Sequence, residues 1–122
     1  MQAARIIRRE PALISATLRI TTTASTKLDI VRLLRSLVEP TRVETGCVSC
    51  ALYTDLQDPN VVVWVEEWSS RDNLERHLRS TKYRKILEAL EMSEQPPDVR
   101  FNTVVETSGM RLIEKARGVE SQ

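Results

Sequence analysis

The chain contains a single histidine, and the residues around it make it the first candidate for acid–base chemistry. His77 lies between Leu74 and Leu78 at helical spacing, so it shares an otherwise apolar helix face with two leucines. A neutral imidazole there can take a proton from a phenol near pH 7, because its ordinary pKa lies close to that pH. The alternative is a half-buried histidine that caps or packs against a sheet.

Two tryptophans flank a glutamate in an alternating apolar segment. Trp64, Glu66 and Trp68 are spaced two apart, so on a strand they share one face. The tryptophans either pack in a core or interface, or form an aromatic wall for a planar ligand. An inward carboxylate between them needs a partner or a shifted pKa. We expect Arg19 or Arg100, on neighbouring strands, to supply that partner.

Cys47 and Cys50 form a C-x-x-C pair. A redox pair of this kind needs its first cysteine at a helix N-terminus, where the thiolate is stabilised. Here the pair falls on a predicted strand, where residues three apart point to opposite faces. A zinc site would need further ligands, and the chain has one histidine. We therefore expect two free thiols that diverge across the sheet, with no metal and no cofactor.

Hydrophobic periodicity gives the elements that would position these residues. Alternation predicts strands over residues 12–21, from Gly46 to Tyr53, over 61–68 and over 99–107. Helical spacing predicts one helix that follows Thr26 and ends near Pro40. A second helical region follows a cap at Ser69, breaks at 80–81 and stops at 96–97. The order is βαββαβ, which predicts an α+β fold with a four-stranded antiparallel sheet.

Both faces of the predicted strands carry apolar residues. The helices can cover one set. No element of a monomer is left to cover the other set. We assign to it Leu13, Tyr53, Val62, Trp64 and Trp68. A partly apolar uncovered sheet face predicts a homodimer joined through the sheets.

Length and charge set further bounds. A chain of 122 residues fits one domain, which we place at 12–107, with an N-terminal arm over 1–11 and a charged C-terminal tail over 108–122. The net charge of +1 gives no strong field for nucleic acid or an anionic membrane. We see no membrane span and no convincing signal peptide, because Glu10 and Pro11 follow the basic start at once. The cytoplasm is the default location.

Several short motifs together resemble the antibiotic-biosynthesis-monooxygenase-like family over residues 12–107. They are Gly46-Cys47, the turn over 55–60, Glu67-Trp68-Ser69 and Leu74-x-x-His77-x-x-Ser80. The resemblance implies a ferredoxin-like monomer whose sheet packs on a second copy as a dimeric α/β barrel. It also implies a pocket between sheet and helices for a small organic ligand. We expect His77 as its catalytic residue and a lining of Leu18, Cys50, Trp68, Leu74, Tyr83 and Leu87.

The resemblance implies three functions. Some members of the family oxygenate quinol-type aromatics without metal or flavin, so the first hypothesis is a cofactor-independent monooxygenase acting on a quinol-like or polyphenolic compound. The alternative is a non-catalytic small-molecule-binding protein of the same fold. Haem degradation ranks lower, because the positions of the polar first-strand residue and of the iron ligand look like Leu18 and Leu87 here. RNA binding is disfavoured, because the strand over 61–68 is acidic and lacks the required glycine.

Overall fold

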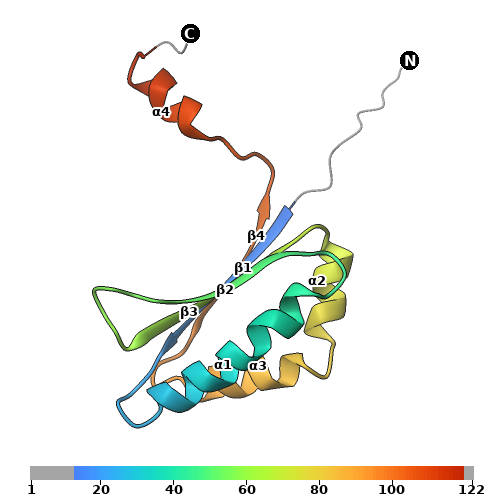
Figure 1. The fold of residues 1–122 in the computed structure, drawn as a ribbon, viewed down its shortest axis with the longest axis vertical. Coiled ribbons are helices and arrows are strands. Elements are labelled where there is room, and N and C mark those ends of the chain that lie inside the picture. Colours follow the sequence, from blue (N-terminus) through green and yellow to red (C-terminus); the bar gives the residue numbers. More distant parts are fainter. Residues whose placement is uncertain (1–12, 120–122) are drawn as a thin grey trace.

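A computed structural model describes residues 13–119 of the chain (Figure 1). The predicted N-terminal arm, 1–11, lies outside the described residues. The strands are β1 (Leu13–Thr21), β2 (Cys47–Thr54), β3 (Val61–Trp68) and β4 (Asp98–Val104). The helices are α1 (Lys27–Arg42), α2 (Arg71–Leu78), α3 (Tyr83–Glu91) and α4 (Met110–Ala116). The predicted βαββαβ order is confirmed, with the helical region after β3 split into α2 and α3.

The four strands form one antiparallel sheet in the order β2-β3-β1-β4. Helices α1, α2 and α3 lie along one face of this sheet (Figure 1). The predicted α+β class with a ferredoxin-like sheet is therefore confirmed. None of the described helices is long and apolar enough to cross a membrane.

The strand register decides which residues lie beneath the helices. Leu18 of β1 pairs with Trp64 of β3 and Ile14 pairs with Trp68, so both tryptophans share the buried face of β1. Val62 lies on the same face and is also buried. The prediction that Val62, Trp64 and Trp68 belong to the uncovered face was wrong. Alternation separates the two faces of a strand but does not say which face the helices cover.

The opposite side of the sheet, called the open face below, has no helix over it within residues 13–119. Tyr53 lies there with 58% of its surface exposed, and Leu13 lies on the same side, as predicted for these two residues. The rest of the open face is made by alternate residues of the strands: Ser15, Thr17, Arg19 and Thr21; Ser49 and Ala51; Val61, Val63, Val65 and Glu67; Asp98, Arg100, Asn102 and Val104.

A β-bulge at the start of β2 corrects the prediction for the cysteines. Cys47 pairs with Trp68, but the next pair is Ser49 with Glu67, so Val48 is an extra residue. The bulge returns Cys47 to the helix-covered side, where Cys50 also lies. The two side chains therefore share one side of the sheet instead of diverging, and both thiols are free. Burial, and then the charge of Glu66, raises the pKa of both thiols, that of Cys50 to about 12.

Helix boundaries differ from prediction in small ways. Helix α1 continues through Pro40 to Arg42, although a proline disfavours helical dihedrals in the residue before it. Helix α2 is capped by Ser70, one residue later than predicted, whose side chain accepts a hydrogen bond from the Asn73 backbone N–H. Helix α4 was not predicted, because its sequence is charged and follows a run of polar residues.

Candidate functional site

His77 lies in the last turn of α2 and is 1% exposed. The position of α2 is fixed by the α1–β2 connection, where Gly46 contacts the first turn of the helix and the segment before it. Gly46 has φ +87, a region that favours glycine, and a Cβ there would collide with the side chain of Asn73. The Gly46 carbonyl accepts a hydrogen bond of 2.8 Å from the Ser69 backbone N–H. The turn that ends α1 therefore passes directly against the start of α2.

The imidazole of His77 bridges two carboxylates from different elements. Its Nε2 lies 2.8 Å from Oε2 of Glu66 on β3. Its Nδ1 lies 2.9 Å from Oε1 of Glu44, in the turn after α1. When the ring is protonated it donates to both carboxylates, and when neutral it donates to one of them.

The Glu66 carboxylate is buried, at 1% exposed, and accepts hydrogen bonds on both oxygens. Trp68 Nε1 donates to Oε1 over 2.9 Å, and Trp64 Nε1 donates to Oε2 over 2.7 Å. The expected partners were wrong: Arg19 pairs with Asp55, and Arg100 pairs with Asp98. The signal for Glu66 was present in the sequence, because W-x-E-x-W places two indole donors and one acceptor on the same strand face.

Glu44 and Lys82 form the outer end of this cluster. Lys82 Nζ lies 2.6 Å from Glu44 Oε2 and also donates to the Pro40 carbonyl over 2.8 Å. The side chains of Glu44 and Lys82 are 21% and 28% exposed, whereas that of His77 is 0% exposed. Sequence reasoning missed both residues, because a turn and a helix start 38 positions apart share no pattern. The result is a hydrogen-bonded path from the core to solvent through Glu66, His77, Glu44 and Lys82.

The surroundings of His77 favour its charged form. Burial lowers the pKa of His77, but the hydrogen bonds and charges of Glu66 and then Glu44 raise it, and the result is a pKa above the ordinary value. The Trp68 ring lies 4.6 Å from the imidazole between centroids, and the edge-on Tyr83 ring lies at 5.1 Å. Burial, with a smaller effect of the Glu66 charge, raises the pKa of Tyr83, so its phenol stays neutral at physiological pH.

The structure places the expected pocket residues unevenly. Leu18, Cys50 and Tyr83 belong to the main core cluster, and Trp68 and Leu74 pack with Ile14 in a smaller one. These five side chains lie on the helix-covered side of the sheet, as His77 does. Leu87 lies apart from them. It is 46% exposed and lines a surface hollow of about 440 Å³ beside Pro96 and Pro97.

A small hollow opens between α2 and the strands β1 and β4. Its volume is about 240 Å³, and Arg71 and Glu75, which form an ion pair of 2.9 Å, line part of it. The remaining lining is mostly apolar: Ile14, Leu74, Leu78, Phe101 and Thr103. Trp68 lies between this hollow and the histidine, because its ring packs behind the lining residues Ile14 and Leu74 and also lies against the imidazole. We call it the α2 hollow.

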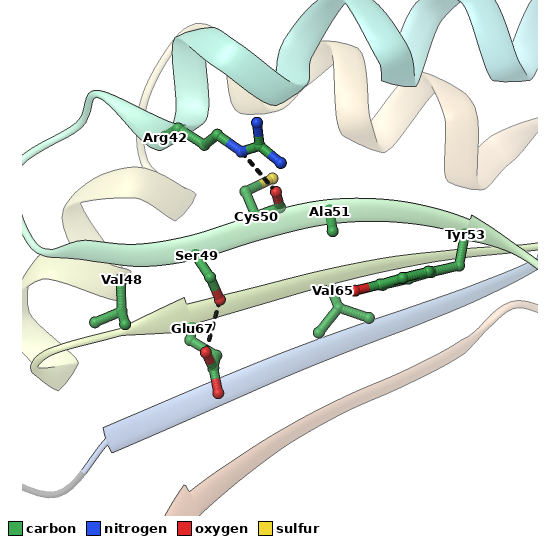
Figure 2. Close-up of a pocket in the computed structure, with 8 residues that line it drawn as sticks. All are labelled: Arg42, Val48, Ser49, Cys50, Ala51, Tyr53, Val65 and Glu67. Carbon is green, nitrogen blue, oxygen red and sulfur yellow. Dashed lines mark hydrogen bonds between the residues drawn. The ribbon is translucent and has the colours of Figure 1, made fainter.

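A second hollow, of about 590 Å³, lies at the β2 margin of the open face (Figure 2). Ser49 Oγ donates to Glu67 Oε1 over 2.6 Å, and Arg42 Nε donates to the Cys50 carbonyl over 2.9 Å at the sheet edge. The other lining residues are Val48, Ala51, Tyr53 and Val65. We call it the β2 hollow. Within residues 13–119 no group of three or more metal-ligating side chains could hold a metal ion.

The fold and site together define a small ferredoxin-like domain with a buried carboxylate–histidine cluster beneath its helices. The model of the family described as antibiotic biosynthesis monooxygenase matches residues 13–89. The chain belongs to this family, which confirms the resemblance drawn from its sequence motifs.

The chain is also similar to individual proteins at low identity. An uncharacterised protein of Synechocystis is 26% identical over 82 residues, which make up 66% of this chain and 56% of that protein. The chain thus spans little more than half the length of this curated relative. A crystal structure of an antibiotic biosynthesis monooxygenase is 26% identical, with a TM-score of 0.68 over 76% of this chain and 99% of that one. A Mycobacterium tuberculosis structure, 23% identical, has a TM-score of 0.72 over 80% of this chain and 99% of its own, and shows the fold alone.

Proposed function

We propose that the protein is a cofactor-independent monooxygenase that acts on a small, electron-rich aromatic compound of the quinol type. Membership of the family supports a role in monooxygenation or small-molecule binding. The observation that carries the finer proposal is the hydrogen-bonded path from the buried Glu66 carboxylate to solvent, with His77 at its centre. Such a path can remove a proton from a dry site, which is the step a quinol needs before it reacts with dioxygen.

We place the substrate ring in the α2 hollow, against Ile14 and Leu74, which pack on Trp68. The volume of about 240 Å³ suits a compact ring, and the lining is apolar with polar groups only at the edge. Glu66 Oε1 accepts a hydrogen bond from Trp68 alone among the described residues. When the indole turns aside, a substrate hydroxyl can take its place at this oxygen. The substrate would then be linked through Glu66 to the imidazole.

The chemistry follows from this placement. The substrate O–H bond breaks and its proton passes through Glu66 to Nε2 of neutral His77, while the Nδ1 proton leaves through Glu44 to solvent. The resulting anion gives one electron to dioxygen, and the two radicals recombine as a new C–O bond. Loss of water from this peroxide leaves one oxygen atom in a hydroxyquinone-type product, and the substrate supplies all the electrons. The protein provides orientation, the proton path and exclusion of water.

Oxygen uptake with a panel of dihydroxy-aromatic compounds, without added metal or flavin, tests the proposal. Uptake should rise with pH through the raised pKa of His77, because only the neutral ring can accept a proton. His77→Ala should lower the rate roughly a hundredfold or more. Because this variant removes a buried side chain, Glu44→Gln provides a second test, with Glu39→Gln as its control on the same end of α1. Undiminished turnover in His77→Ala would refute the proposed role of His77.

A non-catalytic binding protein is the second candidate, and one observation favours it. Both ring nitrogens of His77 and both oxygens of Glu66 already have partners. A fully satisfied buried network is also what a purely structural core cluster requires. Binding of the same aromatic compounds without oxygen uptake, measured by quenching of the tryptophan fluorescence, would establish this candidate instead.

The proposed assembly is a homodimer joined through the open faces. Members of the family are typically homodimers. On this chain the open face carries Val63, Val65, Ala51 and Tyr53, and residues 13–119 contain no helix that covers them. Packing the β1 and β3 parts of two such faces would bury Val63 and leave both α2 hollows on the outer, helical layers.

A further inference from the structure

The C-terminal arm, residues 105–119, is the least buried part of the described chain. It leaves the end of β4 and points away from the sheet, with α4 near its tip (Figure 1). All five of its large apolar side chains are exposed, by 53–90%: Val105, Met110, Leu112, Ile113 and Val119. A segment that stayed in solvent would have no physical reason to carry so many apolar side chains.

Within the arm, few interactions stabilise helix α4. Helix α4 has seven residues, whereas isolated helices shorter than about 12 residues are marginal in water. The backbone hydrogen bonds that flank it stay inside the arm, from Leu112 to Gly109, from Arg117 to Ile113 and from Val119 to Glu114. The described residues show no hydrogen bond from the arm to the sheet or to the other helices. A surface outside this copy is therefore needed to bury its apolar side.

We propose that the arm docks on the open face of a second copy of this chain, at the β2 hollow, and that two copies exchange their arms. The β2 hollow offers an apolar lining of Val48, Ala51, Tyr53 and Val65, of which Val48 and Tyr53 are more than half exposed (Figure 2). Its charged groups are Glu67 and Arg42, and the arm carries both signs of charge to face them, Arg111 and Lys115 on one hand and Glu114 on the other. An exchange in which each copy gives an arm and receives one closes as a two-fold dimer.

The length of the arm fits this arrangement. The five-residue linker over 105–109 can span roughly 17 Å when extended, and α4 adds about 10 Å. The outer strands of a four-stranded sheet lie about 14 Å apart. An arm that starts at β4 of one copy can therefore cross the sheet of a copy stacked on its open face and reach the β2 margin.

The area is also sufficient. The five apolar side chains of one arm expose on the order of 500 Å². Two arms with the surfaces that they cover would bury up to ~2,000 Å², within the range of stable interfaces. The family match covers residues 13–89 and does not include the arm.

The first experiment compares dimer dissociation constants by sedimentation or light scattering. The double variant Leu112→Ser with Ile113→Ser should dissociate at least tenfold more readily than the natural chain. The matched control is Leu56→Ser, which removes a leucine that is 98% exposed in the β2–β3 turn and should leave the constant unchanged. A natural chain that stays monomeric, or an arm variant that dimerises as tightly as the control, would overturn the proposal.

The second experiment locates the arm. Chains carrying Ile113→Cys are mixed with chains carrying Tyr53→Cys, both with Cys47→Ala and Cys50→Ala, and oxidised. A covalent heterodimer should form in the mixture at a rate well above that of either chain alone. The double variant with Ile113→Cys and Tyr53→Cys in one chain separates the alternatives. If it forms only an intramolecular bond at high dilution and at high concentration alike, the arm docks on its own copy and the proposal fails.

Discussion

The Glu66 carboxylate accepts hydrogen bonds from two indoles and one imidazole, all in the core. The alternation of the sequence placed Trp64, Glu66 and Trp68 on one face, so this cluster was within reach of sequence reasoning. Arg19 and Arg100 were predicted as partners because their charge is opposite to that of Glu66. The donors that contact Glu66 are instead the neutral indole N–H groups on the same strand. Glu44 and Lys82 were out of reach, because only the folded chain brings a turn and a helix start to the same imidazole.

Replacing Glu66 tests how much this cluster contributes to stability. Glu66→Gln removes the charge that the imidazolium faces and presents an amide N–H₂ to donors, so it should lower the free energy of unfolding by about 3 kcal/mol. Glu67→Gln is the control, because Glu67 lies on the open face with Ser49 as its partner, and should cost less than about 1 kcal/mol. Urea unfolding followed by tryptophan fluorescence measures both. Equal losses in the two variants would contradict a special role for the buried cluster.

The raised pKa of His77 predicts how stability depends on pH. Because the folded protein holds this proton more tightly than the unfolded chain, the stabilisation is complete below the unfolded pKa of about 6.5. It is lost as pH rises through the higher folded pKa. The free energy of unfolding should therefore fall over this range above pH 6.5. NMR titration of the single histidine gives the folded pKa directly.

Glu44→Gln is the matched variant for this prediction. It keeps an acceptor for the Nδ1 proton but removes one of the two negative charges that raise the pKa of His77. The titration of the histidine should move to lower pH, and the loss of stability should move with it. An unchanged titration would mean that Glu44 does not contact the imidazole in solution.

At the scale of elements, the order and type of the strands followed from periodicity, while local irregularities did not. The bulge at Val48 is invisible in an alternating pattern, yet it decides that Cys47 and Cys50 share one side of the sheet. Helix α4 was missed because a short charged segment carries little periodic signal. The bulge depends on the pairing of β2 with β3, which the local sequence does not encode.

The turn between α1 and β2 holds Glu44 in place, and Gly46 makes that turn possible. Gly46→Ala introduces a side chain at φ +87 and a collision with Asn73, so it should destabilise the protein by about 1–3 kcal/mol. Gly109→Ala is the control, because a Cβ at that position meets nothing within 4 Å. Thermal unfolding compares the two. If Gly46→Ala were as mild as its control, the turn would have to be able to shift away from α2.

At the scale of the whole molecule, the sequence indicated an uncovered apolar sheet face but assigned the wrong tryptophans to it. The helices take Trp64 and Trp68, which leaves the valines of β3 and Tyr53 of β2 for the open face. The argument for a dimer through the sheets therefore survives with a different set of side chains. It also becomes more specific, because Val65 lies on the central part of the open face and lines the β2 hollow.

Val65→Lys tests this interface. A lysine in a buried sheet-to-sheet contact would lose its hydration without gaining a partner, so the dimer should dissociate at least a hundredfold more readily. The isolated fold should persist, because the side chain faces away from the core. Val43→Lys is the control, since Val43 is 80% exposed beside α1 on the helical side. Light scattering measures the assembly and circular dichroism the fold. If Val65→Lys dimerised as tightly as the natural chain, both the sheet contact and the docking of the arm at the β2 hollow, which Val65 lines, would be refuted.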